Sequence, residues 1–86
     1  MYMLAFEKQV YKDLNKIPAK DLDKIYEGFE HLKHNPRMPG GKRLKGASDR
    51  YRLRKGDYRI VYVIDDKTAT VKIMLVRHRK DVYQRR

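Results

Sequence analysis

Arginines alternate with apolar residues between residues 51 and 64, where the chain reads YRLRKGDYRIVYVI. Successive side chains of a β-strand point to opposite faces, so Arg52 and Arg54 share one face and Leu53 lies on the other. Neighbouring guanidinium groups repel one another, and a sheet that collects them on one face is typical of a surface that binds an anion. The planar guanidinium fork binds phosphate oxygens in pairs, which makes phosphate the ligand best suited to this pattern.

A Lys-Gly-Asp turn interrupts this run, and its exact position determines which arginine lies opposite Arg59 across the hairpin. A two-residue turn at Gly56–Asp57 would place Arg54 opposite Arg59. A turn at Lys55–Gly56 would instead place Arg52 opposite Arg59. Both registers put the three arginines on one face, although like charges directly across a strand pair are destabilising. The pattern therefore favours an anion-binding face, and the alternative is a solvated outer face that carries arginine.

The positive charge is concentrated in the second part of the chain. The 86 residues include 22 Lys or Arg and 11 Asp or Glu, a formal net charge of +11 at pH 7. Residues 37–86 hold 16 of the basic and 5 of the acidic residues, whereas residues 1–36 are balanced. Such segregation indicates a binding surface for a polyanion. Nucleic acid, an acidic protein partner and an anionic membrane surface are the three candidates.

Length and composition exclude several classes of protein. Eighty-six residues correspond to a single domain, residues 1–86. The absence of cysteine excludes disulfides, thiolate metal sites and a cysteine nucleophile. The sequence has neither metal-ligand spacing nor a glycine-rich phosphate loop, so we expect no metal and no cofactor. The apolar runs are too short for a signal peptide core or a membrane span, so we expect a cytoplasmic protein without membrane contact.

Hydrophobic periodicity predicts the elements that position the arginines. A short strand is expected at residues 1–6. Apolar residues at helical spacing then predict two helices, one over residues 6–17 and one over residues 22–32, which together form a helical hairpin. Residues 35–50 are rich in Pro, Gly and basic residues, and we interpret them as a linker.

Three strands follow, at residues 51–55, 58–64 and 70–76, joined by short turns. Residues 80–86 are expected to form a short helix or a tail. The predicted fold class is therefore α+β in the order β-α-α-β-β-β, with the helical hairpin packed on a mostly antiparallel sheet. Neither helix can bury its apolar face alone, and the sheet supplies the missing surface.

Three motifs resemble the RelE/ParE superfamily of toxin–antitoxin toxins: RLKG at 43–46, YRLRKGDYRIVY at 51–62 and HRKDVY at 78–83. The resemblance covers essentially the whole chain and is greatest to the RelE branch, whose toxins are ribonucleases that cleave messenger RNA in the ribosomal A site. It implies a cytoplasmic endoribonuclease without a metal, held inactive by a cognate antitoxin. The charge of +11 predicts an acidic antitoxin, which would form a hetero-oligomer with the toxin and provide any contact with operator DNA.

The resemblance implies catalytic roles for five residues: Arg52, Arg54, Arg59, Arg79 and Tyr83. The need for an acid or base near neutral pH adds His78 to this catalytic set. Metal-free RNA cleavage uses the ribose 2′-hydroxyl as nucleophile and needs proton transfer and cations around the phosphorus. Arginine is a poor proton acceptor, so the first three residues are assigned to phosphate binding and charge stabilisation. Arg79 is expected to stabilise the transition state or to help the leaving group.

The groups that transfer protons remain open at this point. Histidine titrates near neutral pH, and His78 beside Arg79 would suit acid–base catalysis, or it packs at the end of a strand. Tyr83 matches a C-terminal tyrosine that stacks on a base or transfers a proton. The remaining basic residues are expected to contact messenger RNA or the ribosome, or else to be solvated: Lys42, Arg43, Lys45, Arg85 and Arg86.

Two other functions are consistent with the sequence. A ParE-like toxin would bind and inhibit DNA gyrase without catalysis, although such relatives generally lack the catalytic set described above. A basic nucleic-acid-binding module would bind a duplex with steep salt dependence and would cleave nothing.

Overall fold

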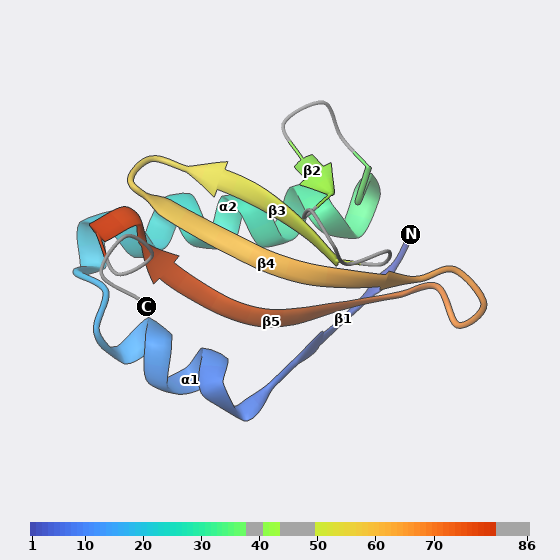
Figure 1. Cartoon of the computed structure of the whole chain (residues 1–86), viewed down its shortest axis with the longest axis horizontal. Helices are drawn as coiled ribbons and strands as arrows, with labels where there is room; N and C mark the ends of the chain where they lie inside the picture. Colours follow the sequence, from blue (N-terminus) through green and yellow to red (C-terminus); the bar gives the residue numbers. More distant parts are fainter. Residues whose placement is uncertain (38–40, 44–49, 81–86) are drawn as a thin grey trace.

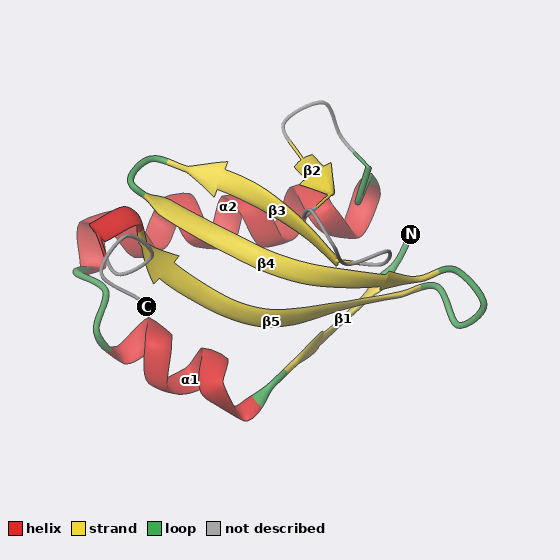
Figure 2. Ribbon diagram, in the orientation of Figure 1, coloured by secondary structure: helices red, strands yellow, loops and turns green. Residues whose placement is uncertain are grey.

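The computed structural model describes residues 1–37, 41–43 and 50–80. The elements are β1 (Met3–Phe6), α1 (Lys8–Asn15), α2 (Ala19–His34), β2 (Gly41–Arg43), β3 (Arg50–Lys55), β4 (Tyr58–Asp65) and β5 (Thr70–His78). The strands form one five-stranded sheet in the order β1-β5-β4-β3-β2 (Figures 1 and 2). Strands β1 and β5 run parallel, and the other pairs are antiparallel. The α+β class and the predicted order of elements are confirmed.

The two helices occupy different positions on the sheet. Helix α2 lies behind β3 and β4 in Figure 1, across one face, while α1 runs beside β5 at the edge of the sheet. Apart from the helical residues Arg79 and Lys80 at the end of β5, the face toward the viewer carries no helix from the described part of the chain, and we call it the open face. The sheet therefore has one face that the helices cover and one face that they leave open.

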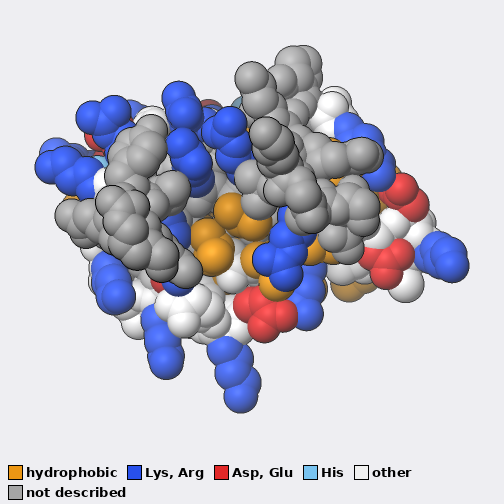
Figure 3. Space-filling model, in the orientation of Figure 1, with side chains coloured by type: hydrophobic (Ala, Val, Ile, Leu, Met, Phe, Trp, Pro, Cys, Tyr) orange, Lys and Arg blue, Asp and Glu red, His pale blue; other side chains and the backbone are white. Residues whose placement is uncertain are grey.

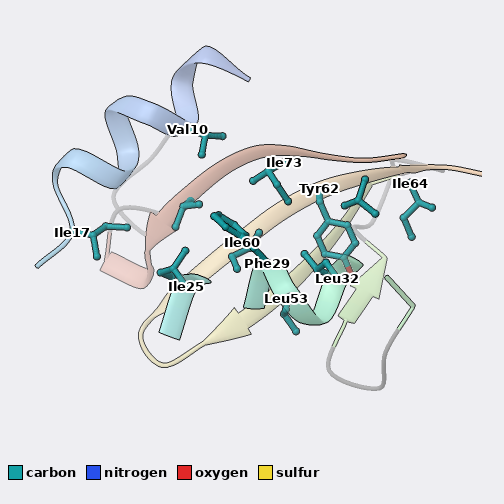
Figure 4. Close-up of a cluster of buried hydrophobic side chains, with 12 residues drawn as sticks. Val10, Ile17, Ile25, Phe29, Leu32, Leu53, Ile60, Tyr62, Ile64 and Ile73 are labelled. Carbon is teal, nitrogen blue, oxygen red and sulfur yellow. The ribbon is translucent and has the colours of Figure 1, made fainter. Parts of the chain in front are cut away.

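The core lies between the helices and the sheet (Figure 4). Its largest fully buried side chains come from both layers: Val10, Ile25, Leu32, Ile60, Tyr62, Val71 and Ile73. The predicted helical spacing explains the contribution of α2, since Ile25, Phe29 and Leu32 repeat at three- and four-residue intervals and are all buried. Burying each side chain of this size stabilises the fold by about 1.5–3 kcal/mol.

One part of the predicted linker is wrong. Residues 41–43 form β2, in which Gly41 pairs with Leu53 and Arg43 pairs with Tyr51 of β3. Three residues are too few to show an alternating pattern, and their strand conformation depends on hydrogen bonds to a partner distant in the sequence. After β5, Arg79 and Lys80 are helical, and the rest of the predicted C-terminal helix or tail lies outside the described residues.

The β3–β4 hairpin adopts the first of the two predicted registers. Lys55 pairs with Tyr58 and Arg54 pairs with Arg59, which leaves Gly56 and Asp57 as the two-residue turn. Gly56 has a φ of 60°, a conformation that residues with a Cβ rarely adopt. The glycine therefore fixes which arginine lies opposite Arg59.

A β-bulge interrupts the pairing of β4 with β5. Val61 pairs with Leu75, but the next residue, Tyr62, pairs with Ile73, so Met74 is an extra residue on β5. Such a bulge reverses the alternation of side chains beyond it. On β5, Ile73 on one side of the bulge and Val76 on the other are therefore both buried against the helices.

Tyr62 connects the sheet to the segment that follows α2. Its hydroxyl donates a hydrogen bond of 2.8 Å to the backbone carbonyl of Pro36, just after α2. Its ring stacks on Tyr51 at a centroid distance of 5.7 Å. Burial raises the pKa of Tyr62 to about 12, so the hydroxyl stays protonated and remains a donor near neutral pH. No helix in the described ranges is both long and apolar enough to span a membrane.

We predict that Tyr62→Phe lowers the free energy of unfolding by about 1–2 kcal/mol, because the carbonyl of Pro36 loses its buried donor. Urea denaturation would measure the change. Tyr26→Phe is the matched control, since Tyr26 is 48% exposed, and it should change stability by less than about 0.5 kcal/mol. Equal effects of the two substitutions would contradict a structural role for the Tyr62 hydroxyl.

A second prediction concerns Asp66 in the β4–β5 turn, which accepts two hydrogen bonds from Arg37 and one from the Tyr2 hydroxyl. The bonds from Arg37, followed by that from Tyr2, lower the pKa of Asp66. A lowered pKa in the folded state stabilises the fold above the ordinary carboxyl range, and this contribution disappears as pH falls through the folded-state value. Asp66→Asn should therefore be less stable than wild type at pH 6, with a smaller difference at pH 3. A difference independent of pH in urea denaturation would refute this.

Candidate functional site

The open face carries a transverse row of arginines, formed by Arg54 of β3, Arg59 of β4 and Arg77 of β5. Arg54 pairs with Arg59, and Arg59 pairs with Arg77, so the three residues lie side by side on adjacent strands. Residues directly opposite in antiparallel strands project to the same face at about 4.5–5.5 Å between Cβ atoms. In Figure 3, Lys and Arg side chains lie above and to the right of a hydrophobic patch on this face. We call the three residues the arginine row.

The arginine row adjoins a hollow at the end of the β3–β4 hairpin. The hollow has a volume of about 180 Å³ and is lined by Arg54, Gly56, Asp57, Tyr58, Arg59 and Arg79. The backbone N–H of Arg79 donates a hydrogen bond of 2.8 Å to the carbonyl of Asp57, which holds the segment after β5 against the turn. Three arginines from three different segments therefore meet at one cavity.

The guanidinium groups of the row are incompletely satisfied within the described residues. Nε of Arg59 and Nη1 of Arg77 are both shielded from solvent and have no hydrogen-bond partner there. Buried polar groups normally have partners, and a buried donor without one costs about 1–3 kcal/mol. Both donors therefore lack an acceptor among the described residues.

Carboxylates contribute little neutralisation on the open face. Arg79 Nε lies 3.9 Å from Asp57 Oδ1, and both side chains are more than half exposed, so this pair is weak. Arg77 Nε lies 3.8 Å from Asp13 Oδ1 at the sheet edge. In the part of the chain that the structure describes, Arg52, Arg54 and Arg59 form no ion pair with a carboxylate. The face therefore keeps most of its positive charge.

His78 lies on the helix side of the sheet. It pairs with Tyr58, and the two rings meet edge to face at 5.1 Å. Its Nδ1 accepts a hydrogen bond of 3.1 Å from the backbone N–H of Lys80, and it lines a cavity of about 360 Å³ beside α1 together with Tyr58 and Arg77. The expectation that His78 acts beside Arg79 stays a prediction.

Arg77 is a residue of the site that sequence analysis missed. The predicted third strand stopped at Val76, one residue short of Arg77, and β5 continues to His78. The signal was present in the spacing of Val71, Ile73 and Val76, which changes from two to three residues. Such a change within a strand indicates a bulge, and a bulge at Met74 brings Arg77 to the face of Arg59.

The other predicted site residues are only partly placed. Arg52 lies on the open face opposite Val61 and beside the arginine row. In β2, Lys42 holds the register position opposite Arg52, and Arg43 follows it. Four predicted site residues lie outside the described residues: Lys45, Tyr83, Arg85 and Arg86.

Comparisons with known proteins agree with this fold. Residues 4–83 match the family of the ParE toxin of type II toxin–antitoxin systems, parDE. The chain belongs to this family and thus to the RelE/ParE superfamily of toxins. Within it the protein is a RelE-like toxin of a type II toxin–antitoxin system.

Three similar proteins are informative. Toxin RelG of Mycobacterium tuberculosis is 34% identical over 85 residues, which covers 98% of each chain. The mRNA interferase toxin RelE of Escherichia coli is 29% identical over 86 residues, covering 95% of this chain and 90% of that protein. The toxin–antitoxin complex RelBE2 of M. tuberculosis contains a chain with a TM-score of 0.79 and 34% identity, covering 90% of this chain and 96% of that one.

We predict that Arg59→Thr raises the free energy of unfolding by up to about 1 kcal/mol, because it removes the central charge of three mutually repelling side chains. The gain should shrink between 50 mM and 1 M salt, since screening weakens the repulsion in the wild type. Arg59→Lys keeps the charge and serves as the control, with no comparable gain. Urea denaturation of a threonine variant no more stable than the lysine variant would contradict the repulsion.

Proposed function

We propose that this toxin is a ribosome-dependent endoribonuclease that cleaves messenger RNA in the A site and so inhibits translation. The observation that carries the proposal is the arginine row, in which Arg59 Nε and Arg77 Nη1 lack an acceptor among the described residues. A phosphate in RNA supplies several anionic oxygens to such donors. The printed name of the E. coli relative, an mRNA interferase, supports the same reaction class.

The proposed reaction is attack of a ribose 2′-hydroxyl on the adjacent phosphorus, with departure of the 5′-oxygen and formation of a 2′,3′-cyclic phosphate. Arg54, Arg59 and Arg77 would bind the scissile phosphate and stabilise the negative charge that grows on its oxygens. Fixed cations directed at developing charge are the largest source of catalysis in many enzymes. Arg79 borders the same hollow and would stabilise the leaving oxygen. The reaction as written requires no metal.

Proton transfer is assigned by elimination. His78 lies on the helix side of the sheet, whereas Arg54 and Arg59 lie on the open face, so it is not included in the proposed mechanism. Arginine itself stays protonated near neutral pH and is a poor base. We therefore assign proton transfer to Tyr83, the remaining candidate in the predicted catalytic set. Nearby positive charge would lower the pKa of a tyrosine and ease the loss of its proton.

The ribosome is proposed to orient the message. The hollow of about 180 Å³ opens at the end of a hairpin and does not enclose a nucleotide chain. In-line attack requires the 2′-oxygen, the phosphorus and the 5′-oxygen to be aligned, and fixing that geometry lowers a barrier by up to about 7–11 kcal/mol. A codon held in the A site would supply this alignment, and the basic residues Lys42, Arg43, Lys45, Arg85 and Arg86 would contact messenger RNA or the ribosome.

The proposed inhibitor is a cognate antitoxin with an acidic segment. The similar M. tuberculosis protein was solved as a toxin–antitoxin complex, and the net charge of +11 favours an acidic partner here. Contact with operator DNA would come through the antitoxin. The toxin alone is proposed to act in the cytoplasm without membrane contact.

A ParE-like function is the alternative, because the matched family is named for ParE. A toxin of that kind would inhibit DNA gyrase and would need no arginine row directed at a phosphate. Inhibition of supercoiling by the purified protein, together with no cleavage of ribosome-bound messages, would favour this alternative.

We predict that purified wild-type protein cleaves a message on translating ribosomes and that Arg59→Ala slows single-turnover cleavage by at least about 100-fold, since a central charge-stabilising group is lost. Lys20→Ala removes an exposed charge from α2 and should leave the rate within about twofold. Gel analysis of labelled message would give both rates.

The chemistry is tested with a message that carries a single 2′-deoxynucleotide at the cleavage position. Loss of cleavage at that position, and a 2′,3′-cyclic phosphate on the product of the unmodified message, are expected. A wild-type protein inactive on translating ribosomes, or equal cleavage of the deoxy-substituted message, would refute the proposed function.

A further inference from the structure

Helix α1 takes the place of a strand along part of the edge of β5. Strand β1 pairs with β5 as far as Phe6 and Ile73, and Glu7 N–H donates the last hydrogen bond, of 2.9 Å, to the Ile73 carbonyl. Beyond that point the edge of β5 faces α1 (Figure 1). The backbone N–H of Val76 donates to Oδ2 of Asp13 at 2.9 Å. A helix side chain thus accepts a hydrogen bond that a neighbouring strand would otherwise accept.

Asp13 is buried, which is unusual for a carboxylate on a short helix. Its residue is 4% exposed, and its Oδ1 accepts a hydrogen bond of 2.9 Å from Gln9 Nε2. Arg77 Nε lies 3.8 Å from the same oxygen. A buried carboxylate is tolerated when hydrogen bonds and an opposite charge compensate its lost hydration. Among the described residues, Arg77 is the cation paired with it.

The Arg77 guanidinium therefore lies between a like charge and an opposite charge. Arg59 is directly opposite Arg77 across the strand pair and repels its guanidinium. Asp13 attracts the guanidinium through Nε from the other side of β5. Nη1 of Arg77 is shielded from solvent and has no partner in the described residues. The carboxylate thus engages Nε of the guanidinium and leaves Nη1 without an acceptor among the described residues.

We propose that Asp13 is a positioning residue that holds the Arg77 guanidinium in the arginine row, and the consequence for cleavage rests on the proposed function. Asp13 acts through Arg77 and does not touch RNA. Its contact with Val76 N–H fixes the carboxylate to the backbone of the strand that carries Arg77, so the two charges move together. Loss of the negative charge would free the guanidinium to turn away from Arg59 into solvent.

The variant Asp13→Asn separates positioning from structure. The asparagine oxygen still accepts from Val76 N–H, and the Gln9 amide can rotate to present its oxygen, so the hydrogen bonds survive while the charge is lost. Asp23→Asn is the matched control, because Asp23 is exposed on α2 and the change in net charge is the same. The side-chain Nε–H signal of Arg77 in ¹⁵N NMR spectra of the full chain reports on its pairing directly.

The expected result has two parts. Asp13→Asn should shift the Arg77 Nε–H signal and speed its exchange with water, and it should slow single-turnover cleavage about tenfold or more, whereas Asp23→Asn does neither. In an Arg77→Ala background, Asp13→Asn should have no further effect on the rate, because the residue through which it acts is gone. Asp13→Glu keeps the charge and should be at least about threefold faster than Asp13→Asn.

Three results would overturn the proposal: an unchanged Arg77 signal in Asp13→Asn, an equal loss of rate with and without Arg77, or equal rates for Asp13→Glu and Asp13→Asn. If Asp13→Asn does not fold, the Arg77 Nε–H signal of the wild type decides, and exchange with water as fast as that of the exposed Arg54 would overturn the proposal. If the wild type cleaves no message, the proposed function is refuted on its own. The Arg77 Nε–H signal in Asp13→Asn, compared with wild type, then shows whether Asp13 holds Arg77.

Discussion

The site depends on one irregularity in the sheet, the bulge at Met74. Without the extra residue, strict alternation from Ile73 would turn Arg77 toward the helices and His78 toward the open face. With it, Arg77 lies directly opposite Arg59, and His78 packs against Tyr58 on the helix side. Bulges are frequent next to functional sites, where they redirect a side chain. Here a single inserted residue places Arg77 on the open face and His78 on the helix side.

The arginine row is maintained at a cost in stability that other parts of the fold offset. Three like charges on adjacent strands repel one another, and two of their nitrogen atoms lack acceptors within the described chain. The opposite face carries a continuous apolar layer covered by α2, and the hydroxyl of Tyr62 ties that layer to the end of the helix. Helix α1 contributes the carboxylate of Asp13 at the edge of β5. The covered face therefore stabilises a sheet whose other face carries the arginine row.

Much of this arrangement could be predicted from local sequence signals, and the remainder could not. Helical spacing of apolar residues gave both helices, and the Lys-Gly-Asp turn gave two candidate registers, of which the structure adopts the one that pairs Arg54 with Arg59. Strand β2 was missed because three residues carry no period and gain their hydrogen bonds from β3. Arg77 was missed because a strict two-residue period cannot describe a strand with a bulge. The role of Asp13 depends on α1 meeting a strand far along the chain, which no local pattern encodes. Tyr83 lies outside the described residues, and its part in catalysis stays a prediction.

The central claim is that the arginine row binds an RNA phosphate, and an NMR titration tests it most directly. Arginine Nε–H signals of the full chain would be followed while a short single-stranded RNA with 2′-O-methyl groups, which block the nucleophile, is added at several salt concentrations. The signals of Arg54, Arg59 and Arg77 should shift together at the lowest RNA concentrations, and the affinity should fall steeply as salt rises. Arg37, already paired with Asp66, should respond least. Shifts at Arg37 or on the helices, with the row unchanged, would contradict the claim.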